Sequence, residues 1–99
     1  MASEGATVVL TAEHCPQLPS YIKLHHDKVR ERWVLLAPER VLEPDDTALE
    51  IVHLCDGKTS VNAIVEAMGA KYQAPAEQML SDIMAMLQDL LDKRFLEVK

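Results

Sequence analysis

Apolar and polar residues follow a strand-like order over the middle of the chain. Residues 21–26 alternate between the two classes, which is typical of a strand with one buried face. Residues 33–37 (WVLLA) are apolar throughout and predict a strand covered on both faces. Residues 40–43 form a third short segment, joined to the second by a tight corner at residues 38–39. We therefore expect an antiparallel meander with the third strand at its edge.

Beyond this third strand the period becomes that of an α-helix. Apolar residues recur three and four positions apart over 48–55, 61–68 and 79–91. Gly57 would end the first helix, and Pro75 would open the third. This order predicts an α+β fold, with a three-stranded antiparallel sheet followed by three helices. It is the outline of a winged helix-turn-helix.

The third predicted helix has an unusually wide apolar face. Its apolar arc covers about 160°, whereas one packing surface needs about 100°. The helix therefore either lies between two layers of core or turns part of this face to an open groove. Its methionines favour an adaptable surface, because thioether side chains are flexible. Two adjacent sectors make up the arc: Met79, Ile83, Met86 and Leu90 in one, and Leu80, Met84, Leu87 and Leu91 in the other.

Residues 1–19 differ from the rest of the chain. They show no sustained hydrophobic period, and Pro16 and Pro19 interrupt backbone hydrogen bonding. We expect residues 1–19 to form a flexible N-terminal tail or linker, and residues 20–99 to form a single domain.

Charge and composition exclude several classes of partner. The net charge of −6 argues against nucleic acid, because phosphate neutralisation by lysine and arginine dominates that affinity. No apolar run approaches the ~18 residues of a membrane span, and no signal-peptide pattern is visible. We therefore expect a cytoplasmic protein without nucleic-acid or membrane partners, with both cysteines reduced.

The chain also lacks a recognisable catalytic or metal-binding pattern. Its histidines and cysteines do not have the spacing of a zinc site. Its three glycines leave no glycine-rich phosphate loop, and no nucleophile stands beside an orienting base. We expect no metal, no cofactor and no enzymatic activity.

Three motifs in a fixed order carry a family resemblance. The chain has LLAPER at residues 35–40, DGKT at residues 56–59, and Asp82-Ile83 followed by Leu87 and Leu90. In this order and spacing they resemble the PqqD family of pyrroloquinoline quinone biosynthesis, over about residues 19–96. The family commonly has a glycine after its third helix, and this chain has Arg94 there. Arginine accepts a left-handed backbone less readily, so a differently capped or looser helix end is expected.

The resemblance implies a precursor-peptide recognition element. Such a domain binds the leader of the PqqA precursor as an extra antiparallel strand along its third strand, and delivers it to the radical SAM enzyme PqqE. Family members occur alone or fused to other pathway proteins, so residues 1–18 could be a former linker. The candidate peptide-binding residues are Arg40, Val41, Leu42 and Glu43 at the strand edge, with Leu80, Ile83, Met84 and Leu87 on the third helix.

Two interpretations of the open edge follow. In the first, main-chain pairing gives affinity and apolar pockets give specificity, with sub-micromolar to micromolar binding of the peptide. Arg40 could then pair with an acidic residue of the peptide, or remain a solvated charge. In the alternative, the chain is a self-associating interaction domain whose edge pairs with a second copy. We expect a monomer or a weak dimer.

Overall fold

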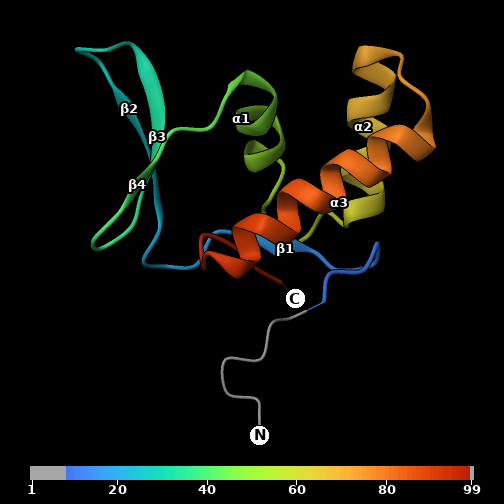
Figure 1. Ribbon diagram of the computed structural model, residues 1–99, viewed down its shortest axis with the longest axis horizontal. Helices are drawn as coiled ribbons and strands as arrows, with labels where there is room; N and C mark the ends of the chain where they lie inside the picture. The colour runs from blue at the N-terminus through green and yellow to red at the C-terminus, as the bar shows by residue number, and fades with distance from the viewer. Residues whose placement is uncertain (1–8, 99) are drawn as a thin grey trace, which may run out of the picture.

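The computed structural model describes residues 9–98 (Figure 1). Residues 1–8 of the predicted tail lie outside this range. Within it, a three-stranded sheet stands beside three helices, and a two-stranded sheet closes the lower end of the molecule. The α+β class and the order of sheet before helices are as predicted.

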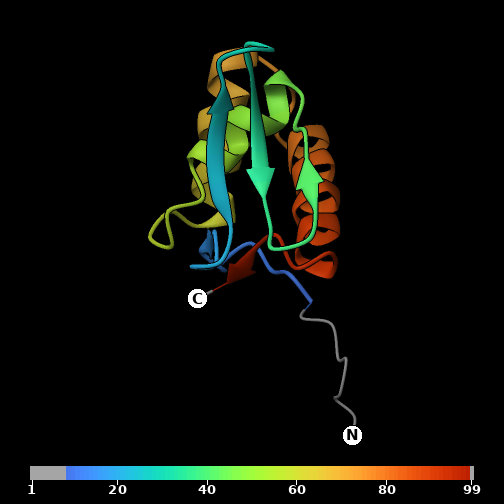
Figure 2. The ribbon, with the colours of Figure 1, turned by 90° about the vertical axis from the view of Figure 1, so that its left-hand side faces the viewer.

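The larger sheet is the predicted meander. Its strands are β2 (Lys23–Asp27), β3 (Arg32–Leu36) and β4 (Val41–Leu42), in the spatial order β2-β3-β4. Both pairings are antiparallel, with Leu36 opposite Val41 in the second. Figure 2 shows the sheet face-on, with β4 on the side nearest to the last helix. The third strand is thus an edge of the sheet formed by the described residues, as the sequence predicts.

Only the middle of β3 is covered on both faces. Val34 and Leu35 point to opposite faces and are 8% and 0% exposed. Trp33, on the same face as Leu35, is 37% exposed at the open end of the strand. The prediction of a fully covered strand is therefore wrong at Trp33, because the rings that lie against it, His26 of β2 and His53 at the end of the first helix, leave part of the indole open; their ring centroids are 4.8 and 5.7 Å away.

The three helices begin and end near the predicted positions. They are α1 (Asp46–His53), α2 (Val61–Tyr72) and α3 (Ala76–Asp92). The side chains of Asp45 and Ser60 cap α1 and α2 by accepting hydrogen bonds from backbone N–H groups in the first turn. Leu35 and the inner faces of the helices form one core, whose most buried members include Leu35, Val61, Ile64, Ile83 and Leu87.

The turn after α1 differs from the prediction that Gly57 ends the helix. Helix α1 ends at His53, and Gly57 lies in the following loop at a φ of 78°. The side chain of Asp56 shapes this loop by accepting hydrogen bonds from the N–H groups of Lys58 and Thr59, at 2.9 and 2.8 Å. These bonds favour the ionised carboxylate and lower the pKa of Asp56.

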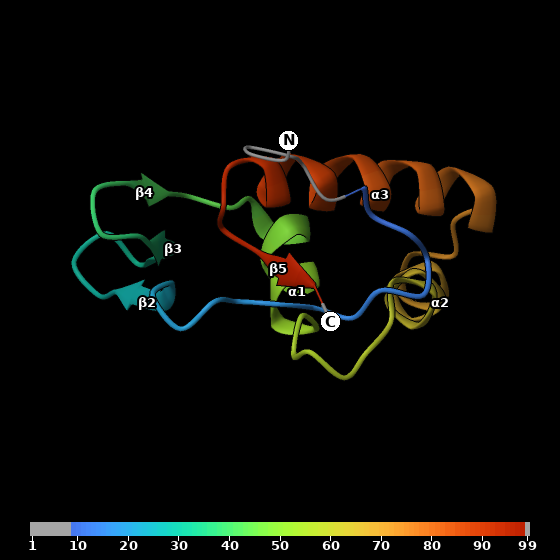
Figure 3. The same cartoon turned by 90° about the horizontal axis from the view of Figure 1, so that it is seen from below.

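Residues 9–19 pack against the domain, where the sequence led us to expect a flexible tail. Leu10 is 4% exposed, and its N–H donates to Oε1 of Gln88 on α3 at 2.9 Å. Strand β1 (Pro16–Gln17) pairs antiparallel with β5 (Glu97–Val98). Figure 3 shows this segment crossing beneath the helices. Residues 9–19 thus add to the core, so a domain boundary at residue 19 would cut through packed structure.

Helix α3 ends in a Schellman motif built around Arg94. The Arg94 N–H donates to the Leu91 carbonyl at 3.0 Å, and the Phe95 N–H donates to the Leu90 carbonyl at 2.9 Å. Leu90 and Phe95 are 6% and 3% exposed, which supplies the apolar contact of this motif. Arg94 itself has a φ of 68°. The helix end is therefore regularly capped, with arginine in the conformation that glycine prefers.

Replacing Arg94 with glycine should raise the free energy of unfolding by about 0.5–1 kcal/mol, since relief of the left-handed backbone outweighs glycine's added chain entropy. Urea denaturation would measure the difference. The matched control is Lys93→Gly, because Lys93 has an ordinary helical φ of −87° and offers no strain to relieve. That variant should be less stable than the parent. If Arg94→Gly is also destabilised, the strain argument fails.

Candidate functional site

Strand β4 presents outward-facing backbone groups at the edge of the sheet. The Ala37 N–H donates to the Arg40 carbonyl at 2.9 Å, so this pair closes the hairpin. Hydrogen-bonded and non-bonded pairs alternate along an antiparallel ladder, so Leu42 bonds towards β3. The N–H and C=O groups of Val41 and Glu43 consequently point away from β3. Pro44 has no N–H and ends the run.

A hollow of about 190 Å³ lies beside this edge, between β4, α1 and α3. Its walls combine apolar side chains from all three elements. Leu42 comes from the strand, Val52 from α1, and Met86 with Leu90 from α3. An extended chain placed along β4 would therefore turn alternate side chains into an apolar space.

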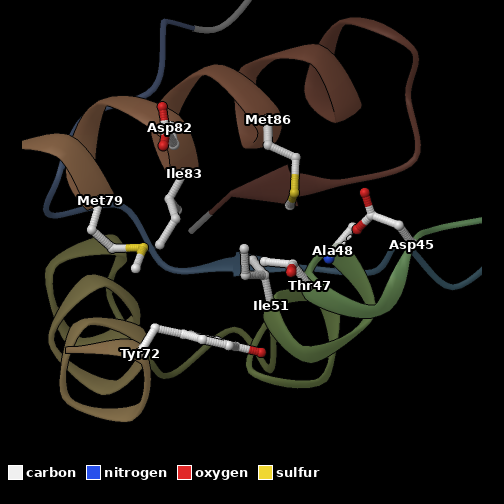
Figure 4. A pocket seen from close by; sticks show the side chains of 9 residues that line it. All are labelled: Asp45, Thr47, Ala48, Ile51, Tyr72, Met79, Asp82, Ile83 and Met86. Atoms are coloured by element: carbon white, nitrogen blue, oxygen red, sulfur yellow. Dashed lines mark hydrogen bonds between the residues drawn. The ribbon is translucent and has the colours of Figure 1, made fainter. Parts of the chain in front are cut away.

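A second hollow of about 340 Å³ continues between α1 and α3 (Figure 4). From α3, Met79, Ile83 and Met86 point towards α1, while Tyr72 reaches across from the end of α2. The Tyr72 hydroxyl donates to the Glu50 carboxylate on α1. Three residues line both hollows, so the two form one continuous depression, which we name the β4–α3 groove; the shared residues are Asp45, Ala48 and Met86.

The predicted residues of α3 divide between the groove and the core. Ile83 lines the second hollow, although it is only 2% exposed. Leu80, Met84 and Leu87 line neither hollow. Leu87 is 0% exposed, and the other two are half-buried against the core. The groove instead receives the adjacent sector of the helix, with Met79, Met86 and Leu90.

The reason for this division is the packing of α3 on two sides. The N-terminal segment covers one side of the helix through Leu10 and the hydrogen bond to Gln88. A helical-wheel projection of the sequence contains both sectors, but it does not show which of them is covered by a segment distant in sequence. The peptide-binding role of all the named positions remains a prediction.

Arg40 has contacts within the domain. Its guanidinium carbon lies 4.6 Å from the centroid of the Phe95 ring, and its Nη2 donates to the Lys93 carbonyl. Arg40 therefore joins the β3–β4 hairpin to the C-terminal end of α3. This contact holds β4 beside the helix, and it places the arginine at one end of the groove instead of along its floor.

The charged side chains that line the groove are all carboxylates. They are Glu43, Asp45, Asp82 and Asp89. Two of the four have cationic partners outside the lining: Arg32 lies 2.8 Å from Glu43, and Lys93 lies 3.0 Å from Asp89.

Asp45 and Asp82 have neutral partners instead. Asp45 accepts from the Ala48 N–H at 2.8 Å, and Asp82 accepts from the Gln78 amide at 3.0 Å. The rim of the groove is therefore negative.

Other kinds of site find no support within residues 9–98. No group of three or more histidine, cysteine, aspartate or glutamate side chains could hold a metal ion there. None of the described helices is long and apolar enough to cross a membrane. Cys55 is 6% exposed, and its burial, with a smaller contribution from Asp56, raises the pKa of its thiol to about 12. Cys55 is therefore a small buried hydrophobe.

Comparison with known proteins gives consistent matches across most of the chain. A sequence profile of the family described as "Coenzyme PQQ synthesis protein D (PqqD)" matches residues 32–96. A "PqqA binding protein" of Rhodopseudomonas palustris strain BisB5 is 52% identical over 97% of this chain and 92% of its own length. The protein of the same name from Bradyrhizobium diazoefficiens is 54% identical over 82% of this chain and 79% of its own length.

Two solved structures share the fold. One is the solution structure of the PqqD truncation of Methylobacterium extorquens PqqCD, described as a functional, stand-alone recognition element for ribosomally synthesised and modified peptides. It has a TM-score of 0.75 and 39% identity, covering 89% of this chain and 94% of that one. The crystal structure of PqqD from Xanthomonas campestris has a TM-score of 0.57 and 38% identity, covering 89% and 98%. The profile, the relatives and the solved structures together show that this chain belongs to the PqqD family.

Proposed function

We propose that this protein binds the PqqA precursor peptide as a strand added to β4, along the β4–α3 groove. The observation that carries the proposal is the outward direction of the Val41 and Glu43 backbone groups beside an apolar hollow. Relatives that carry the name "PqqA binding protein" supply the identity of the peptide. The protein has no catalytic part in this proposal.

The short ladder on β4 limits what main-chain pairing can contribute. Val41 and Glu43 offer two N–H and two C=O groups, and each hydrogen bond adds about 0.5–1.5 kcal/mol net. A disordered peptide also loses conformational entropy when it is ordered on the edge. Burial of apolar side chains in the groove must therefore supply a large part of the affinity, which we expect to be micromolar or tighter.

The groove floor in this proposal comes from the sector of α3 that faces α1. Met79 and Met86 are half-buried and line the hollows. Flexible thioethers can adapt to different side chains of the incoming strand. Ile83 contributes from below, where it also belongs to the core.

Two methionines on the same helix give a direct test of this floor. Met86→Ala should weaken binding of synthetic PqqA peptide about fivefold, because it removes about 1 kcal/mol of apolar contact. Met84→Ala is the matched control: Met84 is also half-buried on α3 but lines neither hollow. It should change affinity less than about twofold. Isothermal titration calorimetry gives both affinities, and thermal melting confirms that both variants fold.

The opposite result would place the peptide on the other face of α3. If Met84→Ala weakens binding while Met86→Ala does not, the sector containing Leu80, Met84 and Leu87 is the floor. If neither variant changes affinity, binding does not use this part of α3. Trp33, the only tryptophan of the chain, adjoins Glu43 near the end of β4 and offers a fluorescence signal for the same titration.

We further propose that the bound peptide is presented to the radical SAM enzyme PqqE. Family resemblance supports this step, and strand addition suits it, because a short ladder with a groove allows release of the peptide after modification. Pull-down of PqqE with and without PqqA peptide tests the step. If PqqE is captured both with and without the peptide, the result supports presentation. If the peptide and the enzyme exclude each other from the protein, the result contradicts it.

A further inference from the structure

The negative rim of the groove bears on which strand can occupy it. Helix α3 contributes Asp82 and Asp89 to this rim, and it has neither lysine nor arginine between residues 76 and 92. At the opposite wall, Asp45 stands at the start of α1 and lines both hollows. An occupant of the groove therefore lies between carboxylates of two different helices.

The positive end of the α1 dipole does not reverse this sign. Asp45 already accepts a hydrogen bond from the Ala48 N–H, and Asp46 is the first residue of the helix. These acidic groups offset the partial positive charge that would otherwise attract a carboxylate. An acidic side chain entering here would meet like charges on both walls of the groove.

We propose that the β4–α3 groove selects a strand whose apolar residues are flanked by lysine or arginine. The apolar side chains occupy the floor formed by Met79, Ile83 and Met86, while the cationic side chains lie along Asp45 and Asp82. The inference rests on the proposed function and adds the charge of the preferred strand. Electrostatic complementarity of this kind sets partner choice and association rate more than total affinity.

Two substitutions remove the rim charge with little change in shape. Asp45→Asn keeps a good helix cap, and Asp82→Asn keeps an acceptor for the Gln78 amide. The double variant should bind synthetic PqqA peptide about five- to tenfold more weakly at low salt. Raising sodium chloride from about 50 to about 500 mM should weaken the parent more than the double variant.

A second double variant controls for the change in net charge. Glu66→Gln with Asp92→Asn alters the charge equally at exposed positions that do not line the groove. It should change affinity less than about twofold. A PqqA peptide whose lysines and arginines are replaced with glutamine should bind the parent more weakly, and removal of the rim charge should then have little further effect.

The outcomes separate this inference from the function on which it rests. If PqqA peptide binds the parent but is insensitive to salt and to the rim substitutions, the charge preference is overturned and the proposed function stands. Tighter binding by the double variant overturns the preference as well. If PqqA peptide does not bind the parent at any salt concentration, both proposals fall.

Discussion

Replacing Leu87 with alanine should lower the free energy of unfolding by about 2–5 kcal/mol, because the side chain is 0% exposed and its loss leaves a cavity. A domain of this size has only about 5–10 kcal/mol to lose, so the variant should be partly unfolded or close to it. Urea denaturation followed by circular dichroism measures the effect.

The matched control for Leu87 is Leu80→Ala on the same helix. Leu80 is half-buried, so its truncation should destabilise the domain by about 1–2 kcal/mol. If Leu87→Ala is as stable as Leu80→Ala and loses only peptide affinity, Leu87 belongs to the binding surface instead of the core. Under the present account, any loss of binding by Leu87→Ala should track its loss of folded protein.

Replacing Val41 with proline should weaken PqqA peptide binding about tenfold or more. Proline removes the outward N–H and places its ring where the added strand would pair, and the lost hydrogen bond accounts for about 0.5–1.5 kcal/mol. The fold should survive, because Val41 is 63% exposed on an edge strand and its N–H points away from β3. Calorimetric titration of the folded variant gives the affinity.

Val41→Ala separates the role of the backbone from that of the side chain. Alanine keeps the N–H while removing the apolar side chain, so its affinity should stay within about threefold of the parent. Equal affinities for the proline and alanine variants would show that the peptide does not pair with β4 at this residue. The self-associating alternative would be favoured by a different result: the parent protein does not bind the peptide, its apparent molecular size rises with concentration, and Val41→Pro abolishes this rise.

Local period was sufficient to predict most of the fold. Alternation over residues 21–26 and the corner at residues 38–39 specify the meander, because strand pairing between near neighbours in sequence needs no distant partner. Helical spacing located α2 and α3. These signals lie within short stretches of sequence, so the elements they predict do not depend on contacts between distant segments.

Contacts between distant segments could not be predicted in the same way. Leu10 packs near Gln88 without any periodic signal around it, so residues 9–19 resembled a tail. That same packing decides which face of α3 is covered. The candidate residues named from the sequence accordingly combine Ile83, which lines the groove, with Leu80, Met84 and Leu87, which belong to the neighbouring sector of the wheel and line neither hollow.

Arg94 is a further case in which the backbone overrides residue preference. Because the family commonly has a glycine at this position, Arg94 led us to expect a differently capped or looser helix end. The Schellman hydrogen bonds and the buried Phe95 nevertheless hold the arginine in the left-handed region. The cost of that conformation is small beside the burial of an aromatic side chain.

An NMR titration of the isotope-labelled domain with PqqA peptide tests strand addition most directly. The account predicts saturable shifts of the Val41, Leu42 and Glu43 amides and of the Met79 and Met86 methyl groups. The amides of β2, on the opposite edge of the sheet, should stay unchanged. Saturable shifts centred on β2 or on the β1–β5 sheet, with β4 unchanged, would contradict it.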